Sequence, residues 1–308
     1  MSNRILITGS SGLVGSALRP VLQRQGIEVV GLDLRGSADE VGDVRDHDRV
    51  QKALRGCSGI VHLAAVSRVI WGERDPQLCW ATNVDGLRNV LDAAAQQSEQ
   101  PWVVFASSRE VYGQPETLPV TEEAPLRPVN VYGRSKVAGE HLMTQAAQKG
   151  LRAAVIRLSN VYGCPQDHAD RVVPAFARAA VEGRALRVDG TDHTFDFTHL
   201  DDTTCGIAAL VHHLRSGAAA LPPIHFLTGQ PTTLGQLASL AIALAASGAS
   251  VQHAPPRNFD VARFYGSPDR AQTLLGWSPR VSLREGLTRL INSFRREFGA
   301  PHQEVSAL

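Results

Sequence analysis

The stretch Arg4-Ile-Leu-Ile-Thr-Gly-Ser-Ser-Gly-Leu-Val-Gly15 decides the fold of this chain. Its apolar run predicts a buried strand, and three glycines at a spacing of three follow directly and open a helical pattern. Glycines there permit a tight turn, close approach of a phosphate to the backbone, and close packing of helix on strand. The N–H groups of the first helical turn attract phosphate oxygens. The sequence therefore predicts a nucleotide-binding strand–turn–helix at its start.

Short apolar runs alternate with longer helical patterns through the first half of the chain. We expect strands at Ile5–Thr8, Glu28–Leu32, Gly59–Leu63, Trp102–Ala106 and Ala153–Leu158, and helices near Gly12–Gln25, Arg45–Arg55, Gln77–Gln97 and Tyr132–Lys149. This alternation is typical of βαβ units, so it predicts an α/β fold with a Rossmann-type, doubly wound parallel sheet. Later elements are shorter and more often broken by proline and glycine. We expect a dinucleotide-binding domain over 1–165 and a smaller C-terminal α/β substrate lobe over 166–308, with some later segments returning to the first domain.

Composition excludes several classes of function. The chain has 308 residues, of which 43% are hydrophobic and 20% charged, and its net charge of +1 offers no broad field for nucleic acid or an anionic membrane. The cysteines, Cys57, Cys79, Cys164 and Cys205, form no C-x-x-C pair, so neither a disulfide framework nor a metal site is expected. No signal peptide or membrane-spanning segment stands out, and we expect a cytoplasmic protein.

Asp33 ends the second predicted strand, where a carboxylate can accept hydrogen bonds from the hydroxyls of an adenine ribose. A 2′-phosphate would meet like charge there, so the position favours NAD over NADP. Arg35 could pair with such a phosphate, which keeps NADP open, and Asp33 could also be a plain strand-end carboxylate. Asp43 and Val44 lie after the next turn, where they could touch the adenine or simply form a surface turn.

Tyr132 and Lys136 are four residues apart and therefore share one face of a helix. An ammonium beside a phenol favours the phenolate and lowers the pKa of the tyrosine from its usual value of about 10. Such a tyrosine can exchange a proton with a sugar hydroxyl near neutral pH. The alternative is a half-buried aromatic ring beside a surface lysine.

Six motifs occur in a fixed order along the chain. They are Gly9-x-x-Gly12-x-x-Gly15, His62-Leu-Ala-Ala65, Thr82-Asn83-Val84, Ser107-Ser-Arg-Glu-Val-Tyr-Gly113, Tyr132-x-x-x-Lys136 and Asn160-Val-Tyr-Gly163. As an ordered set they resemble the extended short-chain dehydrogenase/reductases of the nucleotide-sugar epimerase/dehydratase group. The resemblance covers nearly the whole chain and is most specific in its first 165 residues.

The resemblance implies a catalytic set of Ser108, Tyr132 and Lys136, with Lys136 also gripping the nicotinamide ribose of NAD. Ser108 could otherwise be a helix or turn cap, and Asn83 could simply cap the loop around it. The implied cofactor contacts are Gly9, Ser11, Gly12, Leu13, Val14, Asp33, Asp43, Val44, Leu63, Ala64, Ala65, Asn83, Tyr132 and Lys136. By the same resemblance we expect a homodimer, formed through the helices near Gln77–Gln97 and Tyr132–Lys149.

The family's reaction begins with oxidation of the sugar at C4, and the 4-keto sugar is then epimerised, dehydrated or decarboxylated. Sugar 4,6-dehydratases carry Asp-Glu where this chain has Arg109-Glu110. A guanidinium cannot usefully protonate a leaving hydroxyl, so the dehydratase pair is broken. Glu110 also matches a glutamate of UDP-glucuronate decarboxylases, or it is a structural carboxylate paired with Arg109 or another cation.

Epimerisation demands least of these residues, so the sequence favours an NAD-dependent nucleotide-sugar 4-epimerase for a UDP-hexose or UDP-hexuronate. A decarboxylase, 4,6-dehydratase or 4-ketoreductase remains open. So does a protein of another class, one that binds NAD(H) without catalysis.

The substrate contacts implied by the resemblance are Ser67, Ser108, Arg109, Glu110, Tyr132, Asn160, Arg171, Val172 and Arg257. The chain departs from the family at Phe195, which stands where an arginine usually binds the diphosphate; Arg263 or His193 could replace it. Cys164 stands where proline is frequent. Asp201-Asp202 matches the start of a helix and is most simply read as a cap.

Overall fold

A computed structural model of the protein describes residues 2–217, 221–256 and 261–299. Its central sheet has the strand order β2-β1-β3-β4-β5-β9, and all five strand pairs are parallel. The strands are β1 (Arg4–Thr8), β2 (Glu28–Leu32), β3 (Gly59–His62), β4 (Trp102–Ser108), β5 (Ala153–Leu158) and β9 (Ile224–Phe226). The expected Rossmann-type parallel sheet is therefore confirmed, and the predicted bounds of β2 and β5 agree residue for residue.

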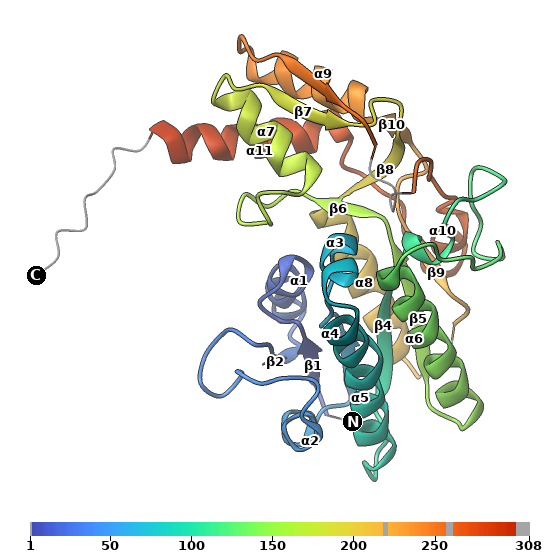
Figure 1. Ribbon diagram of the computed structural model, residues 1–308. Coiled ribbons are helices and arrows are strands. Elements are labelled where there is room, and N and C mark those ends of the chain that lie inside the picture. The colour runs from blue at the N-terminus through green and yellow to red at the C-terminus, as the bar shows by residue number, and fades with distance from the viewer. Residues whose placement is uncertain (1, 218–220, 257–260, 300–308) are drawn as a thin grey trace, which may run out of the picture.

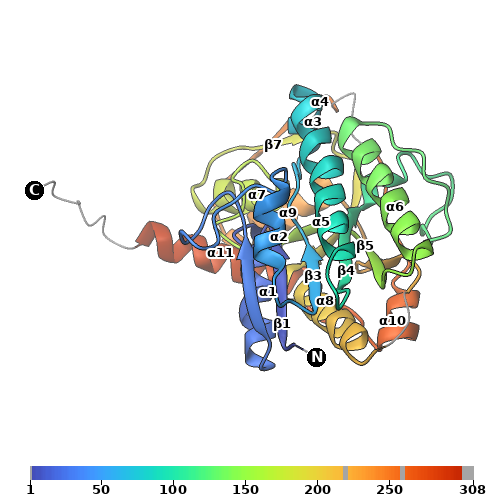
Figure 2. The same ribbon diagram turned by 90° about the horizontal axis from the view of Figure 1, so that it is seen from below.

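Helices cover both faces of this sheet (Figure 2). One face carries α1 (Leu13–Arg24), α8 (Leu200–Arg215) and α10 (Asp269–Leu275), and the other carries α2 (His47–Leu54), α5 (Gly86–Ala95) and α6 (Val131–Gln148). Side chains alternate between the two faces: Ile5 and Ile7 pack in one core and Leu6 in the other, and all three are fully buried. A strand covered on both faces must be apolar at every position, as the run in β1 is.

The segment predicted as one helix over Gln77–Gln97 is broken, and that expectation is wrong in detail. The structure has α3 (Val69–Arg74), α4 (Pro76–Trp80), a π-helical turn (Ala81–Asp85) and then α5. Asp75 begins α4 by accepting a hydrogen bond from the N–H of Leu78. A π turn adds a residue to one turn of an otherwise helical path, and such turns are frequent at functional sites.

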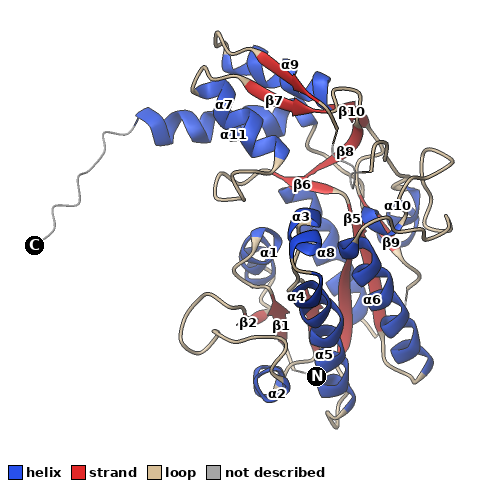
Figure 3. Cartoon of the chain, in the orientation of Figure 1, coloured by secondary structure: helices blue, strands red, loops and turns tan. Residues whose placement is uncertain are grey.

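A smaller lobe lies beyond the carboxyl ends of the large sheet (Figures 1 and 3). It contains a three-stranded sheet of β10 (Pro231–Thr233), β8 (Thr194–His199) and β6 (Asn160–Tyr162), and a pair of β11 (Val251–Ala254) with β7 (Leu186–Asp189). Helices α7 (Val172–Val181), α9 (Leu234–Ala245) and α11 (Leu283–Gly299) supply the rest of its apolar core.

Segments after residue 165 return to the large sheet, since β9 extends it beside β5 and α8 packs on α1. Asp202, on α8, was read from the sequence as a cap, and that reading is wrong. His199 caps the helix by accepting from the N–H of Asp201. The buried carboxylate of Asp202 instead accepts from the N–H groups of Arg280 and Val281, at 3.0 and 2.9 Å, and so fastens the segment before α11 to the first lobe.

Two structural findings bear on the excluded classes. None of the helices in the described ranges has the length and apolarity needed to cross a membrane. Within those same ranges, no three His, Cys, Asp or Glu side chains gather as metal ligands would.

Candidate active site

The functional positions converge at one edge of the large sheet, because parallel strands all end on the same side. The turn after β1 is joined there to the end of β2, because the N–H of Gly9 donates to the carbonyl of Leu32 at 2.8 Å. The loop after β3 is joined to the end of β1, because the N–H of Leu63 donates to the carbonyl of Thr8 at 3.0 Å. Ser108 ends the neighbouring strand β4. The predicted cofactor and catalytic segments are therefore adjacent.

The glycine turn fits a dinucleotide on its geometry alone. Gly9 has a φ of 71°, and a Cβ there would lie 2.7 Å from the backbone nitrogen of Ala64. A Cβ on Gly15 would lie 2.2 Å from the carbonyl oxygen of Gly9. Gly12 begins α1 with no side-chain cap, so the first N–H groups of the helix stay available for a phosphate. Ser11, Leu13 and Val14 are half-buried along this turn.

Asp33 lies against the glycine turn, where a ribose-binding carboxylate would be needed. It accepts hydrogen bonds from the N–H of Ser11 and of Arg35, both at 3.0 Å. The side chain of Arg35 is exposed and folds back to the carbonyl of Ser11. Asp43 is held by Arg45, whose hydrogen bond lowers the pKa of that carboxyl despite partial burial. Val44 is only 5% exposed and packs in the core beneath, which leaves its side chain little surface for the adenine.

The loop after β3 provides a half-buried wall of small side chains, Leu63, Ala64 and Ala65. Asn83 holds this loop in place. Its Oδ1 accepts from the N–H of Val66 at 2.8 Å, and its Nδ2 donates to the carbonyl of Val66 and the hydroxyl of Ser135. Since Asn83 is fully buried, its side chain has the loop-capping role that the sequence left open beside direct cofactor contact.

Ser108 and Tyr132 meet at the end of β4. Tyr132 lies in the first turn of α6, which begins where Asn130 accepts from the N–H of Gly133 at 2.7 Å. The hydroxyl of Ser108 hydrogen-bonds the phenol of Tyr132 and also accepts from the N–H of Glu110 at 3.2 Å. Ser108 is thus both the cap of a short turn and the partner of the tyrosine.

The expected acidification of Tyr132 by Lys136 is contradicted. Burial raises the pKa of Tyr132 to about 12, and the hydrogen bond from Ser108 only partly opposes this. Burial also lowers the pKa of Lys136 to about 8. The ammonium donates to the carbonyl of Ala106 at 2.8 Å and lies 5.8 Å from the centroid of the Tyr132 ring. The i, i+4 spacing placed both side chains on one face but did not reveal how deeply that face is buried.

Glu110 is fully engaged by protein groups. Its Oε1 lies 2.9 Å from Nη2 of Arg109, and its Oε2 accepts from Asn130 at 2.7 Å. The residue is 5% exposed. Of the roles considered for Glu110, the geometry favours the structural carboxylate paired with Arg109.

Three of the predicted nucleotide-sugar contacts, Asn160, Arg171 and Val172, lie where β6 and α7 begin. Asn160 begins β6, and Arg171 immediately precedes α7, which starts at Val172. Nδ2 of Asn160 and Nε of Arg171 are buried without a hydrogen-bond partner among the described residues, although Asp167 lies 3.4 Å from Nε of Arg171. Arg257 lies outside the described residues.

Phe195, where the sequence lacks the expected arginine, is a buried side chain of β8. The ring of His193 meets it edge-on at 6.2 Å, and the backbone of Arg263 bridges to neighbouring Thr194. Both candidate replacements therefore lie beside the position. Cys164 is half-buried, and its thiol lies 3.1 Å from Oε1 of Gln166.

One contact between the lobes was not foreseen. Arg68 follows the half-buried Ser67 and forms a two-pronged ion pair with Asp170, at 2.6 and 3.0 Å. Trp71 meets His168 edge-on at 4.8 Å beside it. The paired segments are 102 residues apart, and nothing local in the sequence links them.

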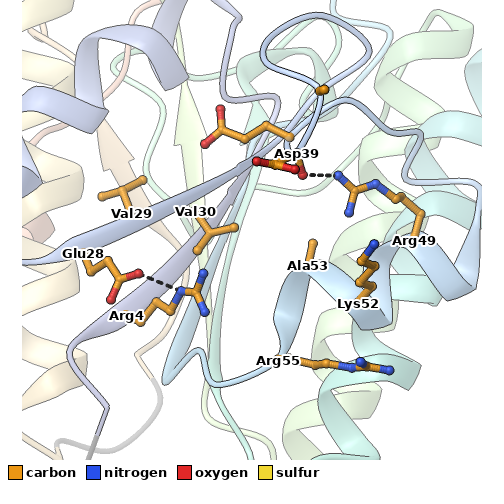
Figure 4. A pocket seen from close by; sticks show the side chains of 11 residues that line it. Arg4, Glu28, Val29, Val30, Asp39, Arg49, Lys52, Ala53 and Arg55 are labelled. Atoms are coloured by element: carbon orange, nitrogen blue, oxygen red, sulfur yellow. Dashed lines mark hydrogen bonds and ion pairs between the residues drawn. The ribbon is translucent and has the colours of Figure 1, made fainter.

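A separate cavity of about 400 Å³ lies at the edge strand β2 (Figure 4). Its walls contain none of Ser108, Tyr132 or Lys136. Within it, Arg4 forms an ion pair with Glu28, and Arg49 donates to the backbone carbonyl of Asp39. We therefore place the chemistry at the carboxyl edge of the sheet and not here.

Known proteins resemble the chain over almost its whole length. Residues 5–222 match the model of the "NAD dependent epimerase/dehydratase family". A UDP-glucose 4-epimerase of Mycolicibacterium smegmatis is 32% identical, covering 96% of this chain and 99% of that protein. A dTDP-glucose 4,6-dehydratase of Streptomyces griseus is 30% identical, covering 94% of each. The UDP-glucuronic acid decarboxylase 1 of Xenopus tropicalis is 31% identical, covering 96% of this chain and 72% of that protein.

Several solved structures share the fold of this chain. The UDP-glucose 4-epimerase of Thermotoga maritima with UDP-glucose superposes with a TM-score of 0.88 at 25% identity, covering 96% of this chain and 99% of the other. MoeE5 in complex with UDP-glucuronic acid and NAD gives a TM-score of 0.86 at 27% identity, again over 96% and 99%. These neighbours share the six-stranded sheet with a smaller second lobe.

Proposed function

Because the chain belongs to the NAD-dependent epimerase/dehydratase family, whose cofactor is NAD, we propose that it is a nucleotide-sugar 4-epimerase for a UDP-hexose or UDP-hexuronate. One observation carries the choice within the family. Ser108, Tyr132 and Lys136 are assembled, while Glu110 has both oxygens occupied and Arg109 stands beside it. The residues that remain can move one proton on and off a sugar hydroxyl, which is all that epimerisation asks of the protein.

Tyr132 takes the proton of the sugar hydroxyl at C4. It returns the proton after the 4-keto sugar has rotated in the site. Ser108 orients that hydroxyl through the hydrogen bond that it shares with the phenol. Bound NAD supplies a hydride acceptor whose positive ring charge favours the phenolate, offsetting the burial that raises its pKa to about 12. Lys136, anchored on Ala106, lies 5.8 Å from the centroid of the Tyr132 ring, where we assign it to the nicotinamide ribose.

Dehydration needs an acid and a base beyond this set. Arg109 cannot protonate a leaving hydroxyl, and Glu110 is held by Arg109 and Asn130, so neither group is free for that task. Decarboxylation of a hexuronate remains the second candidate. A carboxylate at Glu110 matches that reaction's pattern, and the decarboxylase relative is as similar as the epimerase one.

The test is to incubate the NAD-loaded protein with UDP-glucose, UDP-glucuronate and UDP-N-acetylglucosamine, and to follow the configuration at C4 by NMR. An epimer should appear without net formation of free NADH, because the hydride returns to the same sugar. A 4-keto sugar or a UDP-pentose in place of any C4 epimer would contradict the proposal, and the pentose would support the decarboxylase.

The proposal includes a homodimer formed through the helical face of α4, α5 and α6. Leu78 and Trp80, two large apolar side chains of the short helix α4, are 40% and 44% exposed and would be covered in such a dimer. Light scattering should give twice the monomer mass, and Trp80→Glu should lower it. A wild-type protein of monomer mass at micromolar concentration contradicts the dimer.

A further inference from the structure

The guanidinium of Arg109 is fixed from several sides. Its Nη2 pairs with Glu110 at 2.9 Å, and its Cζ lies 4.6 Å from the centroid of Phe195 and 5.8 Å from that of Phe264. Phe195 is 8% exposed and Phe264 is fully buried. A guanidinium stacked on aromatic rings and held by a carboxylate loses little further freedom when it binds a ligand.

One nitrogen of this fixed group is left over. Nη1 of Arg109 is buried and has no hydrogen-bond partner among the described residues. Glu110 does not pair with Nη1, because its Oε1 pairs with Nη2 of Arg109 and its Oε2 accepts from Asn130. A buried N–H without a partner is rare in folded proteins and asks for an explanation. A guanidinium also keeps its charge at every pH of interest, so proton loss cannot relieve it.

The free nitrogen belongs to the neighbourhood of the reacting centre. Arg109 directly follows Ser108, which hydrogen-bonds Tyr132, and the charges of Glu110 and Arg171 both act on the phenol of Tyr132. Phe195, under the guanidinium, lies on β8 two residues from Phe197, whose register partner on β6 is Asn160. Arg109 therefore directly follows the serine that bonds Tyr132, and it stacks on β8, whose neighbouring strand β6 begins at Asn160.

We propose that Arg109 is a specificity-determining residue that binds an oxyanion of the substrate through Nη1. The inference rests on the proposed function, and it names an anionic group next to the sugar: the carboxylate of a hexuronate or the diphosphate. Both offer the same chemistry, oxygens that carry charge and accept from a planar guanidinium. A sugar hydroxyl could accept as well, but a charged acceptor makes the stronger bond.

The experiment measures affinity in the NAD-loaded protein, so that it does not depend on turnover. Titration calorimetry with UDP, UDP-glucose and UDP-glucuronate is done on wild type, Arg109→Gln and Arg127→Gln. Arg127 is a surface arginine, 64% exposed, and pairs with Glu116, so its variant is the matched control. The double variant Arg109→Gln/Glu110→Gln avoids leaving a buried carboxylate alone and serves if the single variant fails to fold.

We expect Arg109→Gln to weaken binding by roughly 10- to 100-fold, while Arg127→Gln stays within about twofold of wild type. A loss confined to UDP-glucuronate assigns the oxyanion to the sugar carboxylate. An equal loss for all three ligands assigns it to the diphosphate. Affinities within twofold of wild type for all three, in the single and the double variant, overturn the proposal. If no C4 epimer forms in the epimerase assay, the proposed reaction is wrong, but these affinities can still be measured and interpreted.

Discussion

The ammonium of Lys136 lies 2.8 Å from the carbonyl oxygen of Ala106, so the lysine is fastened to strand β4 across from its own helix. Phe105, whose ring centroid is 4.8 Å from the ammonium, forms part of the same socket. The lysine is thus held in place by the sheet and not by the tyrosine one turn away. Its charge is buried at a cost to the fold, which the lowered pKa of about 8 records.

Lys136→Met should separate stability from activity. Burial lowers the pKa of Lys136 from 10.5 to about 8, so removing the buried charge relieves a penalty of roughly 3–4 kcal/mol. The carbonyl of Ala106, left unpaired, offsets part of that gain. We expect the free energy of unfolding in urea to be unchanged or higher, and epimerase turnover to fall at least about 100-fold. A fall in the free energy of unfolding of more than about 3 kcal/mol would instead make Lys136 a structural residue.

Tyr132→Phe should retain NAD and lose the proton transfer. Turnover is expected to fall by roughly 10²- to 10⁴-fold, with NAD affinity unchanged. Tyr162→Phe is the matched control, because the hydroxyl of Tyr162 is buried with no hydrogen-bond partner among the described residues. That control should keep full turnover. If both variants turn over sugar like wild type, then Tyr132 is not the acid–base group.

Gly15→Ala should destroy the cofactor site, although alanine normally favours a helix by about 1 kcal/mol. The added Cβ would lie 2.2 Å from the carbonyl oxygen of Gly9 and 2.9 Å from Cα of Ser10, and backbone atoms cannot rotate away as a flexible side chain could. We expect the loss of NAD binding, measured by cofactor fluorescence. The control is Gly248→Ala, where no atom lies within 4 Å of the added Cβ and binding should be normal. Normal NAD affinity in Gly15→Ala would show that the turn can open.

The buried ion pair of Glu140 and Arg157 should be the most sensitive polar contact in the core. Arg157 donates to both oxygens of Glu140, at 2.9 and 2.6 Å, and Ser107, which directly precedes Ser108, donates to the same carboxylate. Breaking such a pair leaves a buried charge alone, so Glu140→Ala should lower the free energy of unfolding by about 3–5 kcal/mol.

The control for that measurement is Glu285→Ala. Glu285 pairs with Arg289 on the exposed face of α11, both at 50% exposure, so the change should be about 0.5 kcal/mol or less. Similar losses in the two variants, measured in urea, would contradict the assignment.

Stability should fall on mild acidification because of two buried histidines. Burial lowers the pKa of His62 to about 3 and that of His225 to about 4, from the usual 6.5. Both stay neutral in the folded protein, whereas the unfolded chain takes up two protons as the pH drops below 6.5. Stability is therefore present above pH 6.5 and is lost down to about pH 3–4. Between pH 7 and 5 the two should remove about 4 kcal/mol, because each histidine costs about 1.4 kcal/mol per pH unit below its unfolded pKa of 6.5.

Urea unfolding at several pH values tests this. His225→Asn should halve the part of the pH dependence of the unfolding free energy that the two histidines cause. His141→Gln, on the exposed side of α6, should leave that pH dependence unchanged. A pH-independent free energy of unfolding over this range would rule out neutral buried histidines.

The regular part of the fold could be read from the sequence because local pattern and tertiary environment agree there. The strand Glu28–Leu32 is apolar where it is buried, and the glycine turn needs its glycines for backbone reasons alone. The break within Gln77–Gln97 could not be predicted from the sequence. The π turn at Ala81–Asp85 contains Asn83, which hydrogen-bonds Val66 in a loop, and the two residues are 17 positions apart.

At the candidate site, residue types and order were readable but electrostatics were not. Spacing alone brings Tyr132 and Lys136 to one helical face, while the sign of the tyrosine's pKa shift depends on how much protein covers it. The pairing of Arg109 with Glu110 was foreseen as one alternative, since the two are adjacent in sequence. The stacking of Arg109 on two aromatic rings was not foreseen, because Phe195 and Phe264 are distant from it in the sequence.

The return of the chain to the large sheet has a consequence for synthesis on the ribosome. Strand β9 ends at Phe226, and α8, which covers Leu18 and Leu22, ends at Arg215. A nascent chain of 165 residues therefore carries the glycine turn and the loops after β2 and β3, yet it leaves the edge of β5 unpaired. The apolar face that α1 shares with α8 and α10 is then only partly covered. The dinucleotide half cannot mature as a module ahead of the rest, and a cut at residue 165 would release an aggregation-prone fragment and not a working cofactor domain.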